Sequence, residues 1–171
     1  MMGPIFLGLS LPVLLAAAQT SAPDGWKEVT SKDGKFKAVM PAEPMEKKQV
    51  VKTATGQLTV KLLVAEGRDD AVFVVSYTDY PEADLKKGAV EKRLDQARDG
   101  AVSSSGGKLN TEQAIKLNNH PGRHLTIEKD GKIIARMRIY LVNRRLYQVM
   151  VLGGAPNKDV GSFLSSFELI E

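Results

Sequence analysis

The stretch from Asn118 to Leu152 constrains the fold more than any other part of the sequence. It predicts three consecutive antiparallel strands joined by two short turns. Asp130-Gly131 is the strongest signal for a two-residue hairpin, because both central positions of a type I′ turn need a positive φ. Asn143-Arg144 predicts the second turn, since Asn tolerates the left-handed region well. This stretch indicates a fold but no reaction.

The pairing predicted around Asp130-Gly131 assigns side chains to the two faces of this sheet. One face is expected to carry Leu125 and Ile127 together with Ile134 and Arg136, and the other to carry Ile133, Met137, Ile139 and Leu141. Around Asn143-Arg144, Tyr140 is expected opposite Tyr147, an aromatic cross-strand pair. Because both faces carry apolar residues, a helix is expected on each.

The rest of the chain supplies further strands and two helices. Strands are expected at Trp26–Val29, Phe36–Met40, Met45–Thr55, Gln57–Glu66, Val72–Tyr80 and Lys108–Leu117. Apolar residues at three- and four-residue steps predict a long helix between Asp84 and Ser103, with Asp84 as its N-cap. A short helix is expected at Asp159–Ser166. The fold class is therefore α+β, with a mainly antiparallel sheet of about six to nine strands and the two helices packed on its faces.

Length and composition are those of one ordinary globular domain. The chain has 171 residues, of which 43% are hydrophobic and 26% charged, and its formal net charge is +4. Because it contains no cysteine, a disulfide framework, a thiolate nucleophile, a Cys-ligated metal and a lipid-anchored N-terminal Cys are all excluded.

The N-terminus predicts export. Residues 1–18 carry no charged side chain and are mostly apolar, and Ala16-Ala17-Ala18 supplies a small-x-small cleavage pattern. We interpret residues 1–18 as a signal peptide cleaved after Ala18 or Ala22, with a buried N-terminal helix as the alternative. Residues 19–25 form a polar lead-in and residues 26–171 a single domain. The expected location is the periplasm or the exterior.

Few residues suggest catalysis. His120 and His124 flank Pro121-Gly122, which predicts a turn leading into a strand, and no carboxylate lies within that motif. No Gly-x-Ser-x-Gly motif, calcium loop or phosphate-binding loop is present. The sequence therefore predicts no enzyme, no metal and no cofactor. An envelope enzyme built from His120, His124 and Asp79 stays as an alternative.

One concentration of basic residues interleaves with tyrosines. It suggests a second alternative, a sheet face that binds an anionic polymer. Arg144 and Arg145 at a hairpin tip belong to it, although charges at such a tip also simply keep a turn hydrated. The candidate residues for contact with a ligand or partner are Arg123, Arg136, Arg138, Tyr140 and Tyr147.

The order of these motifs resembles the PsbP-like superfamily, which includes the photosystem II extrinsic subunit and DcrB-like exported proteins. The resemblance is carried by the Trp26 strand, the strand from Phe36 to Pro41, Pro121-Gly122-Arg123, Arg144-Arg145-Leu146-Tyr147 and the closing segment from Ser162 to Phe167. It implies an antiparallel sheet between helices and a non-enzymatic binding or assembly role. It transfers no site residue, and the missing lipid-attachment Cys departs from the lipoprotein members.

The sequence thus predicts an exported, soluble, non-enzymatic domain that binds or assembles with a component of the cell envelope. The expected partner is an unidentified envelope protein or ligand. No specific signal for nucleic-acid binding is present, and no membrane-spanning segment is expected after cleavage.

Overall fold

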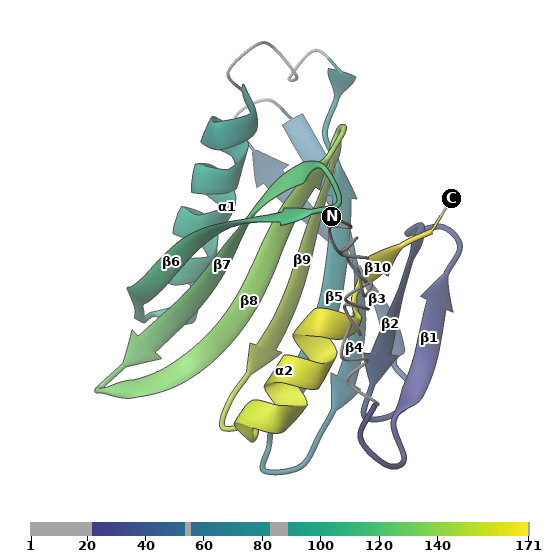
Figure 1. Cartoon of the computed structure of the whole chain (residues 1–171). Coiled ribbons are helices and arrows are strands. Elements are labelled where there is room, and N and C mark those ends of the chain that lie inside the picture. The colour runs from purple at the N-terminus through teal and green to yellow at the C-terminus, as the bar shows by residue number, and fades with distance from the viewer. Residues whose placement is uncertain (1–21, 54–55, 83–88, 171) are drawn as a thin grey trace, which may run out of the picture.

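A computed structural model describes residues 22–53, 56–82 and 89–170 (Figure 1). The signal peptide predicted at residues 1–18 and the N-cap predicted at Asp84 lie outside these ranges.

Seven strands form the main sheet, and every neighbouring pair is antiparallel. Their order across the sheet is β3-β4-β5-β9-β8-β7-β6. The bounds are β3 Met45–Thr53, β4 Gly56–Glu66, β5 Val72–Asp79, β6 Lys108–Leu117, β7 His120–Lys129, β8 Lys132–Val142 and β9 Arg145–Leu152. Neighbouring strands of the main sheet are thus joined as hairpins, with one exception. β5 and β9 are neighbours in the sheet but far apart in the sequence.

The two hairpin turns predicted at Asp130-Gly131 and Asn143-Arg144 are confirmed. Asp130 and Gly131 have φ values of 51° and 73°, as a type I′ turn requires, and they join β7 to β8. Asn143 has a φ of 55° between β8 and β9. As expected, Tyr140 then lies directly opposite Tyr147.

The predicted turn at Pro121-Gly122 is wrong. The chain turns earlier, at Asn118, whose φ is 54°, and Leu117 pairs with His120. Pro121 and Gly122 lie inside β7, where Gly122 pairs with Tyr140 of β8. A Cβ on Gly122 would lie 2.4 Å from the carbonyl oxygen of Ile139 and 2.5 Å from the Tyr140 ring. Glycine is therefore needed here for close packing and not for a turn.

The predicted assignment of faces along β8 is also wrong, because a β-bulge shifts the register. Glu128 pairs with Ile133, but the next residue along β7, Ile127, pairs with Ala135. The extra residue, Ile134, is left without a partner on β7. Leu125 and Ile127 therefore share a face with Ala135, Met137, Ile139 and Leu141, and a single hydrophobic core lies on that face.

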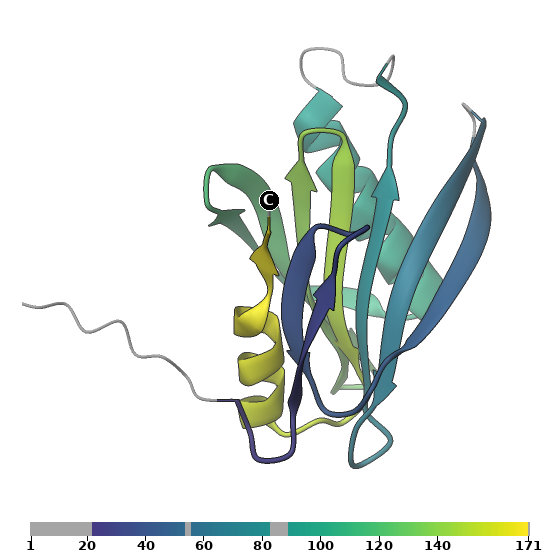
Figure 2. The ribbon, with the colours of Figure 1, turned by 90° about the vertical axis from the view of Figure 1, so that its right-hand side faces the viewer.

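A small second sheet and the short helix cover one face of the main sheet (Figure 2). The sheet has the order β1-β2-β10, with bounds Lys27–Ser31, Phe36–Met40 and Glu168–Leu169, and helix α2 spans Asn157–Ser166. The core here is strongly aromatic. Phe36 is fully buried, and its ring centroid lies 5.3 to 6.2 Å from those of Tyr77, Tyr147 and Phe167.

Helix α1, Ala89–Ser105, packs against the opposite face over β7 and β8. Its fully buried residue, Leu94, joins the core formed by Leu125, Met137, Ile139 and Leu141. The described structure is thus α+β with a helix on each face, which confirms the predicted fold class. The seven-stranded main sheet falls within the expected size, and the small three-stranded sheet is an addition to it.

Candidate functional site

Helix α1 covers only part of its face of the sheet. Leu94 packs over β7 and β8. Four small residues of the helix face towards β4, β5 and β9: Ala97, Gly100, Ala101 and Ser104. At spacings of three and four residues they lie along one stripe of the helix. Side chains this short do not fill the space between helix and sheet, and a groove results.

The groove has a volume of about 620 Å³, which lies within the range of small-molecule sites. Its apolar wall comes mainly from Leu58, Val60 and Leu62 of β4 and from Leu146 and Met150 of β9. Val51 and Gln49 of β3 extend the wall to the edge of the sheet. Among the described residues that line it, only Arg93 carries a charge.

A neutral polar patch interrupts this apolar wall. Ser76 of β5 lies directly opposite Gln148 of β9, and Thr78 follows two residues later on the same face of β5. The Thr78 hydroxyl donates to the carbonyl oxygen of Thr59, 2.9 Å away. Ser76 is 2% exposed, and neither its hydroxyl nor the Gln148 amide is hydrogen-bonded within the described residues. A ligand in the groove would therefore find an available donor and acceptor.

Arg93 and Tyr80 form one end of the groove. The Arg93 guanidinium lies over the Tyr80 ring, 4.6 Å from its centroid, and donates to Gln96 at 3.2 Å. This distance is that of a cation–π contact, which holds the guanidinium near the ring.

The two tyrosines predicted as contact residues belong to the core. Tyr140 and Tyr147 are 3% and 2% exposed and lie beneath α2 and β2. The Tyr140 ring is stacked on Phe167, and the Tyr147 hydroxyl donates to the carbonyl oxygen of Gly34 at 2.7 Å. In this conformation both rings pack the domain together.

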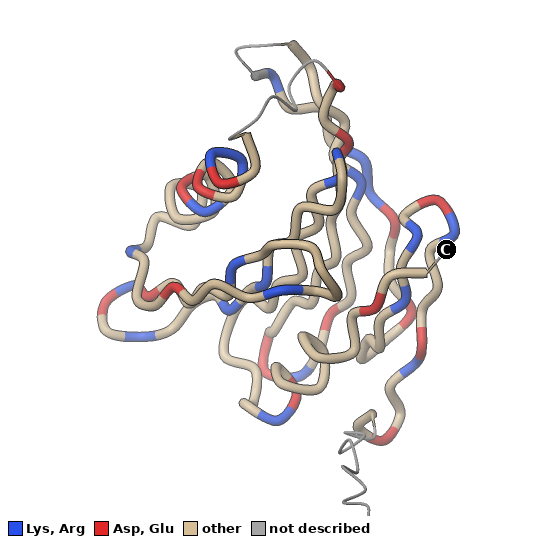
Figure 3. Tube along the Cα trace, turned by 45° about the horizontal axis from the view of Figure 1, so that its top comes forward, with Lys and Arg blue, Asp and Glu red and all other residues tan. Residues whose placement is uncertain are grey.

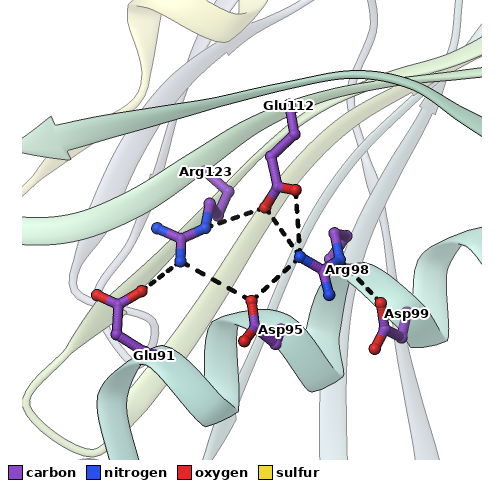
Figure 4. A network of polar contacts seen from close by, with 6 residues as sticks. All are labelled: Glu91, Asp95, Arg98, Asp99, Glu112 and Arg123. Atoms are coloured by element: carbon purple, nitrogen blue, oxygen red, sulfur yellow. Dashed lines mark hydrogen bonds and ion pairs between the residues drawn. The ribbon is translucent and has the colours of Figure 1, made fainter.

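Arg123 lies on the α1 face and joins α1 to β6 and β7 (Figure 4). It is paired with Glu91 of α1 and, at 3.1 Å, with Glu112 of β6. Arg98 of α1 meets the same Glu112 at 3.1 Å. Glu91, followed by its other acidic neighbours, raises the pKa of Arg123. Its charge is thus balanced within the protein.

Arg136 and Arg138 lie on the opposite face from Arg123, because they pair with Thr126 and His124 on β7. Arg138 donates to the carbonyl oxygen of Leu164 at 2.9 Å, where a cation stabilises the C-terminal end of α2. Arg136 forms no ion pair within the described residues. The five predicted contact residues therefore do not share one surface, and their binding to a ligand or partner stays a prediction.

His120, His124 and Asp79 come from distant strands. The histidines lie on β7 and Asp79 at the end of β5, and β8 and β9 separate these strands. That is three strand spacings of about 4.8 Å each. Burial, then the charge of Arg138, lowers the pKa of His124. The described residues contain no cluster of three or more His, Asp or Glu side chains suited to a metal ion.

Asp79 instead belongs to a polar cluster that fastens the β1–β2 hairpin to the main sheet. Arg145 holds Asp79 in a bidentate pair with two contacts of 2.7 Å, and it also donates to the carbonyl oxygen of Asp33 at 2.9 Å. The Asp33 carboxylate accepts from Lys61 and, at 2.8 Å, from the Tyr77 hydroxyl. These bonds, with that of Lys61 foremost, lower the pKa of Asp33.

Charges of both signs are interspersed over the described elements (Figure 3). Among those elements, no helix combines the length and apolar character that crossing a bilayer requires.

The groove is the feature that the sequence prediction missed. The apolar stripe predicted for the Asp84–Ser103 helix includes Ala97 and Ala101, but the prediction assigns no role to Gly100 or Ser104. The spacing of Ala97, Gly100, Ala101 and Ser104 was the available signal, since a face of small residues leaves room beside a helix. The strands that line the groove are set by the order of strands in the sheet, which the sequence prediction did not include.

Comparisons with known proteins add a likeness of fold. No protein-family model matches the sequence, and no curated protein matches it. The structure is similar to the solution structure of cyanobacterial PsbP from Synechocystis sp. PCC 6803, with a TM-score of 0.49 and 11% sequence identity. The match covers 84% of this chain and 92% of that chain. It agrees with the family that the motif order resembles, and no function, site or partner follows from it.

Proposed function

We propose that this chain is an exported, non-enzymatic binding module of the cell envelope that takes an apolar small molecule into the groove beside α1. The observation that carries the proposal is the mainly aliphatic groove, which Ser76 lines with a hydroxyl that has no hydrogen-bond partner within the described residues. A hydroxyl that lines an apolar groove and makes no hydrogen bond within the described residues is available to donate to a ligand or to accept from one.

The lining of the groove indicates the chemistry of the ligand. Most of the wall is aliphatic, and the polar groups within it are the neutral Ser76, Thr78 and Gln148. These features suit an apolar molecule that carries an uncharged hydroxyl, carbonyl or amine. A charged group placed over them would lose its hydration without gaining a counter-ion.

Binding of N-phenylnaphthylamine, an uncharged apolar amine whose fluorescence rises in an apolar site, tests this proposal. The substitution Gly100→Phe places an aromatic ring at the groove, where a Cβ on Gly100 has no atom within 4 Å. We expect at least about tenfold weaker binding, which corresponds to about 1.4 kcal/mol. Ser76→Ala is expected to weaken binding without lowering the melting temperature, because the hydroxyl has no partner to lose.

Gly161→Phe is the matched control, because Gly161 lies on α2 and also has open space around its Cβ position. This variant should bind the probe as the unsubstituted protein does. Equal binding by all four proteins, or none by the unsubstituted protein, would contradict the proposal. Circular dichroism melts identify any variant that has lost its fold.

The proposal of export rests on residues 1–18, which carry no charged side chain and are mostly apolar, and on the small residues Ala16-Ala17-Ala18 at their end. Expression of the full chain in a Gram-negative host, followed by fractionation and mass measurement, tests it. A periplasmic product that begins after Ala18 or Ala22 is expected. A full-length product in the cytoplasm would contradict it.

A further inference from the structure

The two edges of the main sheet differ in how they are protected. β6 has a register shift between Leu109 and Thr111, and several of its side chains are engaged by β7 and α1. β3, in contrast, pairs with β4 in unbroken register over all nine of its residues. Figure 2 shows the β3–β4 hairpin as the outermost element on its side of the molecule. A long, regular edge strand is a template for pairing with another strand.

β3 also exposes an unusual amount of apolar surface. Six large hydrophobic side chains are exposed in the described residues, and three of them lie on β3: Met45 at 52%, Val50 at 60% and Val51 at 38%. Single exposed apolar residues need no explanation, but three on one nine-residue edge indicate a surface that is covered in the assembled protein.

The charges of β3 are complementary to a second copy of the same strand. An antiparallel pair centred on Gln49 places Glu46 of each copy opposite Lys52 of the other. Within the described residues, neither Glu46 nor Lys52 forms an ion pair. Opposite charges directly across an antiparallel pair are stabilising, and like charges there are destabilising.

The same register covers the exposed valines. It places Lys48 opposite Val50 of the second copy and Lys47 opposite Val51, so that each lysine stem lies along a valine while its ammonium group stays in water. Neighbouring registers are worse. Centring the pair on Lys48 sets that lysine against itself, and centring it on Val50 sets Lys48 against Lys52.

We propose that two copies of this chain pair through β3, antiparallel about a twofold axis at Gln49, and so join their main sheets into one. Such an interface is isologous, because the same residues contribute from both copies. The α1 faces of the two copies then lie on the same side of the joined sheet. Since Gln49 and Val51 line the groove, the two grooves become neighbours at the interface.

A single cysteine tests the register directly, because the chain contains none. In Gln49→Cys the two thiols lie opposite each other in the pair, within the Cα separation that a disulfide accepts. Mild oxidation should give a disulfide-linked dimer. Gln113→Cys is the matched control, since Gln113 is an exposed glutamine on the other edge strand, β6, and should stay largely monomeric.

Charge reversal tests the Glu46–Lys52 contact by analytical ultracentrifugation. Glu46→Lys and Lys52→Glu should each weaken the dimer at least about tenfold, because each substitution creates two pairs of like charges across the interface. The first changes the formal net charge from +4 to +6 and the second from +4 to +2, so general repulsion cannot account for both losses. The double variant should dimerise again, and so should an equimolar mixture of the two single variants.

A monomer at every accessible concentration would overturn this proposal. So would a dimer whose dissociation constant is the same in the unsubstituted protein and in every charge-reversal variant. A dimer whose Gln113→Cys variant cross-links better than its Gln49→Cys variant would assign the contact to β6 and overturn it too. None of these outcomes depends on whether the groove binds a ligand.

Discussion

Tyr77 shows how a single residue connects the two sheets. It lies on β5 and is 5% exposed, and its hydroxyl reaches Asp33 at the tip of the β1–β2 hairpin, 2.8 Å away. Lys61 and Arg145 lie over its ring, at 5.6 and 5.1 Å from the centroid. Burial, and then the bond to Asp33, raise the pKa of Tyr77 to about 12.

This raised pKa predicts loss of stability in alkali. The folded protein holds the Tyr77 proton more tightly than the unfolded chain, whose tyrosines have a pKa of about 10. The stabilisation is therefore complete below pH about 10 and is lost as the pH rises towards about 12. Urea denaturation across this range should show a falling free energy of unfolding.

Tyr77→Phe is the informative variant for this pH dependence. Its free energy of unfolding should fall less steeply between the same pH values. Tyr140 and Tyr147, whose pKa values burial also raises, contribute to the remaining slope, as does Lys37, whose pKa its bond to Glu168 raises. Identical slopes for variant and unsubstituted protein would show that Tyr77 is not the residue responsible.

Two glycines in regular elements have opposite roles. Gly122 in β7 has no space for a side chain, because the Ile139 carbonyl and the Tyr140 ring occupy it. Gly100 in α1 has open space and an ordinary helical backbone, so it only weakens the helix. The fold needs the first glycine, whereas the second leaves the groove wide.

Alanine substitutions separate these two roles. Gly122→Ala should destabilise the protein by about 1–3 kcal/mol through overpacking. Gly100→Ala should stabilise it by up to about 1 kcal/mol, because alanine has the higher helix propensity. Chemical denaturation measures both changes, and Gly154→Ala, with open space and no positive φ, should be nearly neutral. A stable Gly122→Ala protein would show that β7 and β8 can separate at little cost.

At the scale of the whole molecule, the described residues form two cores, one on each face of the main sheet. The aromatic core beneath α2 includes the small sheet, and Phe36 brings that sheet into contact with rings from β5, β9 and the segment after α2. The core beneath α1 is mostly aliphatic, and the groove lies beside it.

Phe36→Ala should therefore cost about 3–5 kcal/mol of unfolding free energy. Amide hydrogen exchange should show the loss of protection first in β1, β2 and β10, while α1 stays protected by its own core. Leu109→Ala, at an exposed position on β6, should cost less than about 1 kcal/mol. Simultaneous loss of protection in α1 would mean that the two cores unfold as one unit.

The sequence by itself determined the local structure. The Asp130-Gly131 and Asn143-Arg144 turns, the two helices and most of the strands follow from turn chemistry and periodicity, which depend on neighbouring residues. The α+β class and the helix on each face followed from the same patterns.

The tertiary structure decided everything that depends on residues far apart in the chain. The bulge at Ile134 exchanged the faces of β8, and one register shift is enough to do so because strand side chains alternate with a period of two. The separation of Arg123 from Arg136 and Arg138 and the burial of Tyr140 and Tyr147 followed from the same arrangement. The groove arises only where small residues of α1 meet β4, β5 and β9, a contact that strand order and helix placement create and no local pattern encodes.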